Sequence, residues 1–416
     1  MNEVNIIGAY STQFKRWPDK TYRDLAREVY LGVLADAGMA TGSEIEFAYF
    51  GNCAMPAVGQ SSIRGQVTFI PLVREGLFPE RVPIINVEGA CATASMAFHS
   101  GWKDILSGQS QVVLAVGMDK FYFPEQAAQM LQSFSGGMDQ MTTEETVSVY
   151  EEAGRIVGTP FQSGPDRSFF MDTYAMQALY YMWKHGVTQR QIAVGAAKNH
   201  NFGAKNPKAQ YRFEMTVDQV LADRLISYPL TRSMCAPIGD GAAAAILCSA
   251  SYLKGCPAEV RNRAVKIRAS VLTGGKYRAY DDPSLSYAAA QKAYLISGLK
   301  PSDIHVAEVH DATSFCEIYQ AEMMGFAPIG QGGRFVEEGQ TSLEGEIPIN
   351  TSGGLVSKGH PVGATGLGMI YELVTQLREE AGERQVKGAA LALQENGGGV
   401  IGFEEAACSV IILEKE

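Results

Sequence analysis

Hydrophobic positions along the chain change their period several times, and the changes predict helices that alternate with strands. Residues 25–51 read as an amphipathic helix, a glycine stop, a polar turn and then a strand over 45–50. Residues 287–310 repeat this order, with a helix over 288–296 and a strand over 304–309. The pattern therefore predicts two halves built on one plan.

A second correspondence lies deeper in each half. The turn at 86–91 precedes a predicted helix and the apolar strand 112–116. Its counterpart is the glycine-rich turn at 350–361, which leads into a helix reaching Leu377 and a strand over 388–393. Strands alternating with helices predict buried, mostly parallel sheets, and duplication predicts two sheets packed around shared helices. We therefore expect an α/β fold with five layers in the order α/β/α/β/α.

The region between the halves has a different composition. Residues 121–224 carry Met, aromatic and polar residues in no simple period, which indicates an inserted loop or lid domain. The small-residue strand at 239–244 then returns the chain to the first half. The expected N-terminal half covers 1–120 and is completed by 225–255, and the C-terminal half covers 256–416.

Composition narrows the class of protein. The chain has 416 residues, of which 46% are hydrophobic and 19% charged, so it can bury a large core. A net charge of −10 argues against nucleic acid as a partner. The N-terminus has no basic leader followed by an apolar core, and no apolar run is long enough to span a bilayer. We expect a cytoplasmic protein with no membrane partner.

Seven cysteines show neither Cys-x-x-Cys spacing nor a compact framework, so we expect no metal site and no disulfides. One stretch is locally basic in this acidic chain. It is interpreted either as a solvated face or as a surface for the phosphates of a cofactor, and its candidate phosphate-binding residues are Lys198, Lys205, Lys208 and Arg224.

Cys91 is the candidate nucleophile. It follows a Gly-Ala pair and opens a helix, so free backbone N–H groups and the positive helix end would favour its thiolate. Such settings lower a cysteine pKa to about 3.5–7.5. The alternative is an inert buried thiol.

Two histidines are candidate partners. His360 lies in the equivalent turn of the second half, and pseudo-twofold packing would bring the two turns together. His310 follows a predicted strand and precedes Asp311, so it would project from the end of a sheet, where ligands bind in α/β folds. Either residue could instead be a hydrogen-bonded histidine of a turn.

Four motifs together resemble the thiolases, specifically the sterol-carrier-protein type and the archaeal acetoacetyl-CoA type. The resemblance spans essentially the whole chain in the right order. The motifs are Gly89-Ala90-Cys91-Ala92-Thr93-Ala94-Ser95, the run from Gly359 to Gly366, His310-Asp311, and the run from Gly239 to Ala244. The resemblance implies the thiolase fold and a homodimer.

The resemblance also implies a mechanism. Cys91 would attack a 3-oxoacyl-CoA, a carbon–carbon bond would break, and coenzyme A, a substrate, would resolve the acyl-enzyme. The reverse reaction is a Claisen condensation. His360 would activate Cys91 and help to hold a thioester oxygen, and His310 would orient a water or donate to a second oxyanion site. The other oxyanion hole would combine the backbone N–H of Cys91 with the turn that carries Asn396, Gly398 and Gly399.

Two departures from the family pattern concern proton transfer. Related thiolases usually read His-Asp-Cys-Phe where this chain reads His-Asp-Ala-Thr at 310–313. Two-cysteine thiolases read Cys-x-Gly-Gly-Gly where this chain has Glu395 in the place of the cysteine. Our hypothesis is that Glu395 is the general acid/base, with a pKa raised by an apolar site. A water held by His310 is the alternative.

Thiolases without a zinc or OB-fold domain of their own resemble catalytic subunits that work with a small zinc-containing OB-fold protein. One such relative is benzoylsuccinyl-CoA thiolase, which releases benzoyl-CoA and succinyl-CoA, and that reaction is our specific hypothesis. The alternatives are a condensing acetoacetyl-CoA thiolase or synthase, a thiolase-fold aldolase, and a non-catalytic acyl-CoA-binding subunit.

Overall fold

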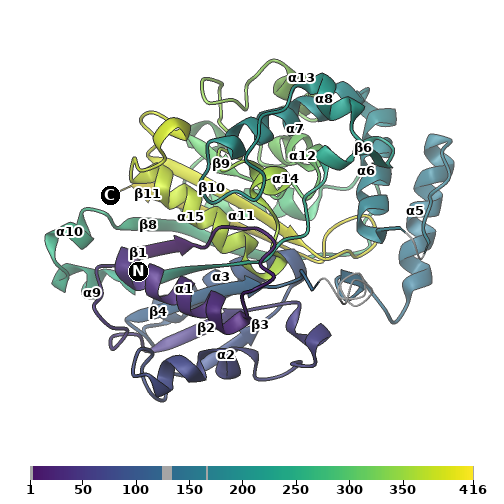
Figure 1. Cartoon of the computed structure of the whole chain (residues 1–416). Coiled ribbons are helices and arrows are strands. Elements are labelled where there is room, and N and C mark those ends of the chain that lie inside the picture. The colour runs from purple at the N-terminus through teal and green to yellow at the C-terminus, as the bar shows by residue number, and fades with distance from the viewer. Residues whose placement is uncertain (1–2, 124–133, 165–166, 416) are drawn as a thin grey trace.

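The computed structural model describes residues 3–123, 134–164 and 167–415. Nine of the strands form one large sheet, and β5 (Leu225–Ser227) and β6 (Leu230–Thr231) form a separate hairpin (Figure 1). In spatial order the strands of the large sheet are β3 (Ile84–Val87), β2 (Phe47–Gly51), β4 (Val112–Asp119), β7 (Gly241–Ser249), β1 (Val4–Ser11), β8 (Val265–Gly274), β11 (Ala407–Lys415), β10 (Leu391–Gly398) and β9 (Val306–Glu308).

The sheet differs from the expected pair of mostly parallel sheets. Its two parts join where β1 pairs with β8 over two residues, Asn5 with Lys266 and Ile6 with Val265. Three strand pairs are parallel, β2–β3, β2–β4 and β9–β10. Five are antiparallel, β1–β7, β1–β8, β4–β7, β8–β11 and β10–β11. The prediction of mostly parallel strands was wrong, because β11 follows β10 through a short connection that reverses the chain direction.

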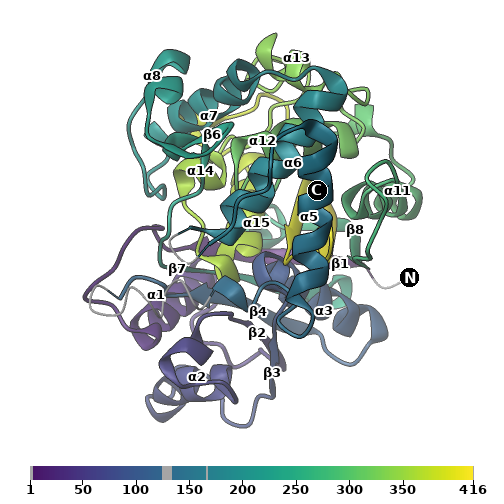
Figure 2. The same cartoon turned by 90° about the vertical axis from the view of Figure 1, so that its right-hand side faces the viewer.

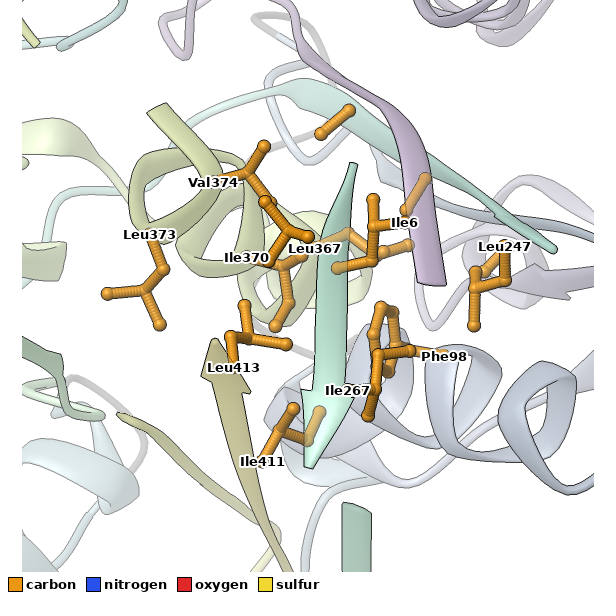
Figure 3. Close-up of a cluster of buried hydrophobic side chains, with 14 of the residues drawn as sticks. Ile6, Phe98, Leu247, Ile267, Leu367, Ile370, Leu373, Val374, Ile411 and Leu413 are labelled. Atoms are coloured by element: carbon orange, nitrogen blue, oxygen red, sulfur yellow. The ribbon is translucent and has the colours of Figure 1, made fainter. Parts of the chain in front are cut away.

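Two helices form the shared middle layer, as the duplication predicted. They are α3 (Thr93–Ser107) and α15 (Thr365–Leu377), which pack on each other and on strands of both parts of the sheet. Figure 3 shows Phe98 of α3 and α15 side chains, among them Leu367, Ile370 and Val374, beside strand residues of both parts, among them Ile6, Ile267 and Ile411. The layered α/β fold class is confirmed.

Outer helices cover the remaining faces. On the N-terminal side these are α1 (Tyr22–Asp36) and α2 (Arg64–Arg74), with α9 (Ala250–Gly255) and α10 (Ala258–Arg261) at the edge. On the C-terminal side they are α11 (Leu285–Ser297), α12 (Ser314–Met323), α13 (Gly332–Glu337) and α14 (Gly354–Lys358). Within the described ranges, no helix is both long and apolar enough to cross a bilayer.

The described part of the region between the halves is largely helical. It contains α5 (Thr143–Val157), α6 (Phe169–His185), α7 (Gln189–Ala204), α8 (Val217–Ala222) and a hairpin of β5 (Leu225–Ser227) and β6 (Leu230–Thr231). In Figure 2, α5 and α6 lie in front of the body. Side chains of α6 and α7 share a buried cluster with α12, among them Tyr181, Ile192 and Phe315.

The predicted end of the α15 helix at Leu377 is confirmed. The strand expected over 388–393 instead begins at Leu391 and runs to Gly398. Gly388 has a φ of +71°, which is not an extended conformation, so the strand cannot begin there. At its other end, β10 pairs with β11 as far as Gly398. Asn396 and Gly398 are therefore strand residues and not turn residues.

Candidate active site

Cys91 lies in a single 3-10 turn, Ala90–Ala92, at the N-terminus of α3. Ala90 adopts a left-handed backbone with a φ of +49°, a strained conformation for a residue with a Cβ. The Thr93 hydroxyl accepts a hydrogen bond of 2.9 Å from the backbone N–H of Gly89 and so holds the turn in place. The helix N-terminus places the positive end of the helix dipole next to the thiol.

His360 approaches Cys91 from the other half of the chain. Its Nε2 lies 3.2 Å from the Cys91 Sγ, and its Nδ1 lies 2.6 Å from the Thr365 hydroxyl. That hydroxyl donates to the carbonyl of Pro361 at 3.0 Å, so it accepts from Nδ1–H of the imidazole. The Nε2 atom is then the unprotonated nitrogen and can accept the proton of the Cys91 thiol.

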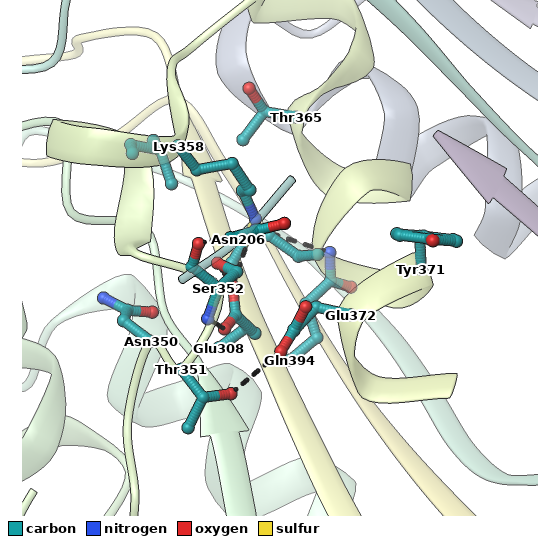
Figure 4. A network of polar contacts seen from close by, with 12 residues as sticks. Asn206, Glu308, Asn350, Thr351, Ser352, Lys358, Thr365, Tyr371, Glu372 and Gln394 are labelled. Carbon is teal, nitrogen blue, oxygen red and sulfur yellow. Dashed lines mark hydrogen bonds and ion pairs between the residues drawn. The ribbon is translucent and has the colours of Figure 1, made fainter. Parts of the chain in front are cut away.

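A buried polar network holds the segment that carries His360 (Figure 4). Glu308, at the end of β9, accepts 2.6 Å from the Ser352 hydroxyl and 3.0 Å from the Ser352 backbone N–H. The Lys358 ammonium pairs with the same carboxylate at 3.2 Å. All three side chains are buried, so removing one partner would leave an uncompensated buried charge or polar group.

Asp119 connects the two halves beside the site. One carboxylate oxygen accepts from the backbone N–H groups of Cys53 and Ala54 at 3.1 and 2.8 Å. The other accepts from the N–H of Gly363, three residues after His360, at 2.6 Å. Burial raises the pKa of Asp119 to about 7, and the backbone N–H donors act in the opposite direction.

His310 is the third member of the cluster. The ligand atoms of Cys91, His310 and His360 all lie within 4.8 Å of one another, and the two imidazole rings meet edge to face with centroids 5.4 Å apart. The His310 Nδ1 lies 3.5 Å from a carboxylate oxygen of Glu405. His310 is completely buried.

The two imidazoles have opposite pKa shifts. Burial disfavours the His310 cation, but the neighbouring Cys91 and Glu405 side chains outweigh it and raise the pKa of His310 well above its usual value. Burial, then the charges of His310 and Lys358, lower the pKa of His360 well below its usual value. The environment thus favours a neutral His360 and a cationic His310, and such a separation is typical of paired acid and base groups.

Among the described residues, the same triad is the group of ligand-type side chains that is compact enough to hold a metal ion. A thiol hydrogen-bonded to an imidazole, with the imidazole oriented by a further group, is also the arrangement of an activated nucleophile. The geometry accordingly needs no metal to explain it.

The glycines at the end of β10 lie against the Cys91 turn. A Cβ on Gly398 would lie 2.3 Å from the backbone nitrogen of Ala92 and 2.7 Å from that of Cys91, so this approach requires glycine. Gly399 has a φ of +73°. The Asn396 side chain accepts 2.8 Å from the Ser95 hydroxyl and thus ties β10 to α3.

Glu395 is completely buried on the opposite side of β10 from Asn396. Its carboxylate accepts a 3.0 Å hydrogen bond from the backbone N–H of His310 and a 3.4 Å contact from the Cys408 thiol. Burial, followed by the charge of Glu405, raises the pKa of Glu395 to about 8. The residue therefore supports the His310 backbone directly.

The four basic candidates do not form one cluster. Lys198 has its ammonium 2.7 Å from Glu317 in a buried pair, which occupies it structurally. The Lys208 ammonium lies 4.3 Å from the ring centroid of Tyr10, and burial lowers its pKa. The two others, Lys205 and Arg224, are exposed.

A cavity of about 330 Å³ lies between α6, α12 and the segment before α11. Its walls carry several aromatic side chains beside charged ones, and Glu405 is part of the lining. The aromatic residues that face it include Tyr174, Tyr180, Tyr181, Tyr280, Phe315 and Tyr319.

Two family matches together cover most of the chain. Residues 4–251 match the family described as thiolase, N-terminal domain, and residues 282–414 match the one described as thiolase C-terminal domain-like. The chain belongs to the thiolase family. The expected enzyme class, an acyl-CoA C-acyltransferase, is confirmed with it.

Sequence relatives of this thiolase match it over nearly its whole length. An acetyl-CoA acetyltransferase of Methanothermobacter thermautotrophicus is 35% identical over 97% of this chain and 98% of its own. Sterol carrier protein 2 of Bos taurus is 35% identical over 98% of this chain and 74% of its own. These are the two types of relative that the sequence motifs indicated.

Solved structures share the fold of the thiolase. An Ltp2–ChsH2(DUF35) aldolase superposes with a TM-score of 0.76 at 22% identity, covering 99% of this chain and 98% of its own. A human mitochondrial 3-ketoacyl-CoA thiolase in complex with CoA has a TM-score of 0.66 at 17% identity, covering 100% and 98%. At these identities the likeness concerns the fold.

Sequence reasoning missed several residues of the site. Thr365 lies inside the glycine-rich run already singled out, and a hydroxyl five residues after a candidate base was a usable signal. Asp119 closely follows the predicted strand 112–116 and could have been found in the same way as His310. Glu405 lies in an irregular connection, and no periodic pattern marked it.

Proposed function

We propose that this thiolase cleaves a 3-oxoacyl-CoA with coenzyme A through an acyl-enzyme on Cys91. The observation that supports this most directly is the 3.2 Å contact between the Cys91 Sγ and the His360 Nε2. Because Thr365 holds the other ring nitrogen, His360 is set to take the thiol proton, and the thiolate can then attack the 3-oxo carbon. The carbon–carbon bond breaks, and coenzyme A takes the acyl group from Cys91.

The contact between Cys91 and His360 favours this reaction over aldol cleavage. Aldol cleavage of a 3-hydroxyacyl-CoA forms no acyl-cysteine and has no use for an activated thiol at Cys91. The aldolase among the structural neighbours resembles this chain in fold at 22% identity, which carries no activity across. A condensing thiolase or synthase would use the same Cys91–His360 pair and is distinguished by its products.

For the substrate we propose an acyl group with an aromatic ring, with benzoylsuccinyl-CoA, cleaved to benzoyl-CoA and succinyl-CoA, as the specific candidate. The support is the aromatic lining of the cavity, because aromatic rings pack favourably edge to face or offset. One wall of the cavity is Glu405, which contacts His310 of the cluster.

For the partners we propose a homodimer that binds a small zinc-containing OB-fold protein. The support is the structural neighbour Ltp2–ChsH2(DUF35) aldolase, whose name includes a DUF35 component. Among the four basic candidates, the exposed Lys205 and Arg224 are best placed for the phosphates of coenzyme A, with Lys208 beside them in sequence.

The test is to incubate the pure protein with a panel of 3-oxoacyl-CoA esters that includes benzoylsuccinyl-CoA, with and without the OB-fold protein. Intact-mass measurement should find an acyl adduct in the wild type and none in Cys91→Ser. A wild type that releases products without any adduct at Cys91 would reject the acyl-enzyme. Equal turnover of aliphatic and aromatic esters would reject the substrate proposal alone.

A further inference from the structure

Glu405 is held next to His310 by its close packing on the backbone of Gly397 in β10. It lies in the connection 399–406 between β10 and β11, and its side chain is 17% exposed. A Cβ on Gly397 would lie 2.1 Å from the Glu405 carboxylate, so the carboxylate rests directly on the Gly397 backbone. Any other residue at 397 would displace it from His310.

The His310 ring has few other partners. Apart from the ion pair with Glu405, neither ring nitrogen makes a hydrogen bond to any of the described residues. The titratable groups around it are Cys91 on the turn before α3, His360 on the turn before α15, Glu395 on β10 and Glu405. Of the two carboxyl groups, Glu395 bonds to the His310 backbone, and Glu405 faces its ring.

We propose that Glu405 is the positioning residue that keeps His310 protonated and oriented, and that His310 is the acid/base group for the carbon–carbon bond step. This inference rests on the proposed thiolase reaction and fills the role that a second cysteine has in related enzymes. When the His310 Nδ1 faces Glu405, the Nε2 has no hydrogen-bond partner among the described residues and can carry the proton that is to be transferred. A carbanion formed next to Cys91 could be protonated from there.

The proton balance of the reaction closes with these two histidines. His360 takes the thiol proton of Cys91, and the thiolate sulfur bonds to the 3-oxo carbon. When the bond between C2 and C3 breaks, its electron pair stays on C2, and the imidazolium of His310 protonates that carbon. In the second half, His310 takes the thiol proton of coenzyme A, whose sulfur bonds to the acyl carbon. The Cys91 sulfur leaves and recovers its proton from His360.

The electrostatics of the site agree with this division of roles. Against the effect of burial, the neighbouring Cys91 and Glu405 side chains raise the pKa of His310, and the pKa of His360 is lowered. Removing the Glu405 charge should lower the pKa of His310. If His310 must be protonated for cleavage, the alkaline limb of the kcat/KM profile then moves to lower pH.

The test compares Glu405→Gln with the wild type in two reactions. The first is acylation of Cys91 by a p-nitrophenyl acyl ester, whose p-nitrophenolate leaves without a proton from His310. The second is cleavage of whichever 3-oxoacyl-CoA has the highest turnover in the panel. We expect acylation to stay near the wild-type rate and cleavage to fall by about 10²–10⁴-fold, the usual contribution of general acid–base catalysis. The alkaline limb of the kcat/KM profile for cleavage should also move to lower pH.

Glu404→Gln is the matched control, because Glu404 is the neighbouring carboxylate and bonds to the backbone N–H groups of Lys276 and Leu285. It should keep the wild-type ratio of cleavage to acylation. Wild-type cleavage in Glu405→Gln, a parallel loss of both reactions, or an unmoved alkaline limb would each overturn the inference. If Glu405→Gln does not fold, Glu405→Asp must show a smaller shift of the limb in the same direction. A wild type that forms no adduct at Cys91 rejects the proposed function instead.

Discussion

Thr365 lies 2.6 Å from the Nδ1 of His360 and donates its own hydrogen to the Pro361 carbonyl. The hydroxyl therefore selects the imidazole tautomer that leaves Nε2 free to act on Cys91. Thr365, the first residue of α15, thus sets the protonation state of the proposed catalytic pair.

Replacing Thr365 with Val should remove that selection with little change in shape. We expect the rate of Cys91 acylation to fall by roughly 10²-fold, the lower part of the range for general-base catalysis. Thr365→Ser keeps the hydroxyl and should stay close to the wild type. Rapid-quench acylation kinetics of the three proteins give the answer, and equal rates for Val and Ser would show that the hydroxyl does not set the tautomer.

Gly398→Ala should distort the 3-10 turn that carries Cys91. The new Cβ would lie 2.3 Å from the Ala92 nitrogen, so β10 and the turn must move apart. Overpacking of this kind costs about 1–3 kcal/mol, which denaturant unfolding can measure. Acylation should fall more than stability predicts, because the backbone N–H of Cys91 is displaced. Wild-type kinetics in the variant would argue against an oxyanion hole at this position.

Glu395→Gln tests whether Glu395 is the general acid/base. If Glu395 is that group, Cys91 should still be acylated while carbanion chemistry is lost. Full turnover in the variant would reject the role. Comparison with Glu405→Gln then shows which carboxyl group is needed for proton transfer.

Asp119 makes stability depend on pH in a defined direction. Its folded-state pKa of about 7 lies above the ordinary value of 3.8, so the folded protein binds the proton more tightly than the unfolded chain. This contribution is complete below the ordinary value and is lost as pH rises through about 7. Denaturant unfolding at a series of pH values should show the loss, and Asp119→Asn should be less stable overall but flatter between pH 4 and about 7. An equally steep profile in the variant would exclude Asp119 as its source.

Much of the layered fold could be predicted because its elements are local. The helix that ends at Leu377 and the strand beginning at Val112 carry their own period and stop signals. Strand direction could not be predicted in this way, since β7 and β11 enter the sheet according to connections whose path depends on tertiary packing.

The residues of the candidate site also differ in how far the sequence predicts their positions. Cys91 and His360 lie in equivalent turns of a duplicated plan, and duplication alone brings them together. Glu405 reaches His310 only because the connection after β10 folds back over Gly397, and nothing in the hydrophobic pattern specifies that path. Residues placed by irregular backbone need the three-dimensional structure.

The proposed nucleophile and its proposed base each lie just before a different middle helix, Cys91 before α3 and His360 before α15. Their 3.2 Å separation consequently reports how well those two helices are packed. A small increase in the distance between α3 and α15 would separate the Cys91 Sγ from the His360 Nε2 while both helices remain folded. On gradual heating, catalysis should fade before circular dichroism registers any melting.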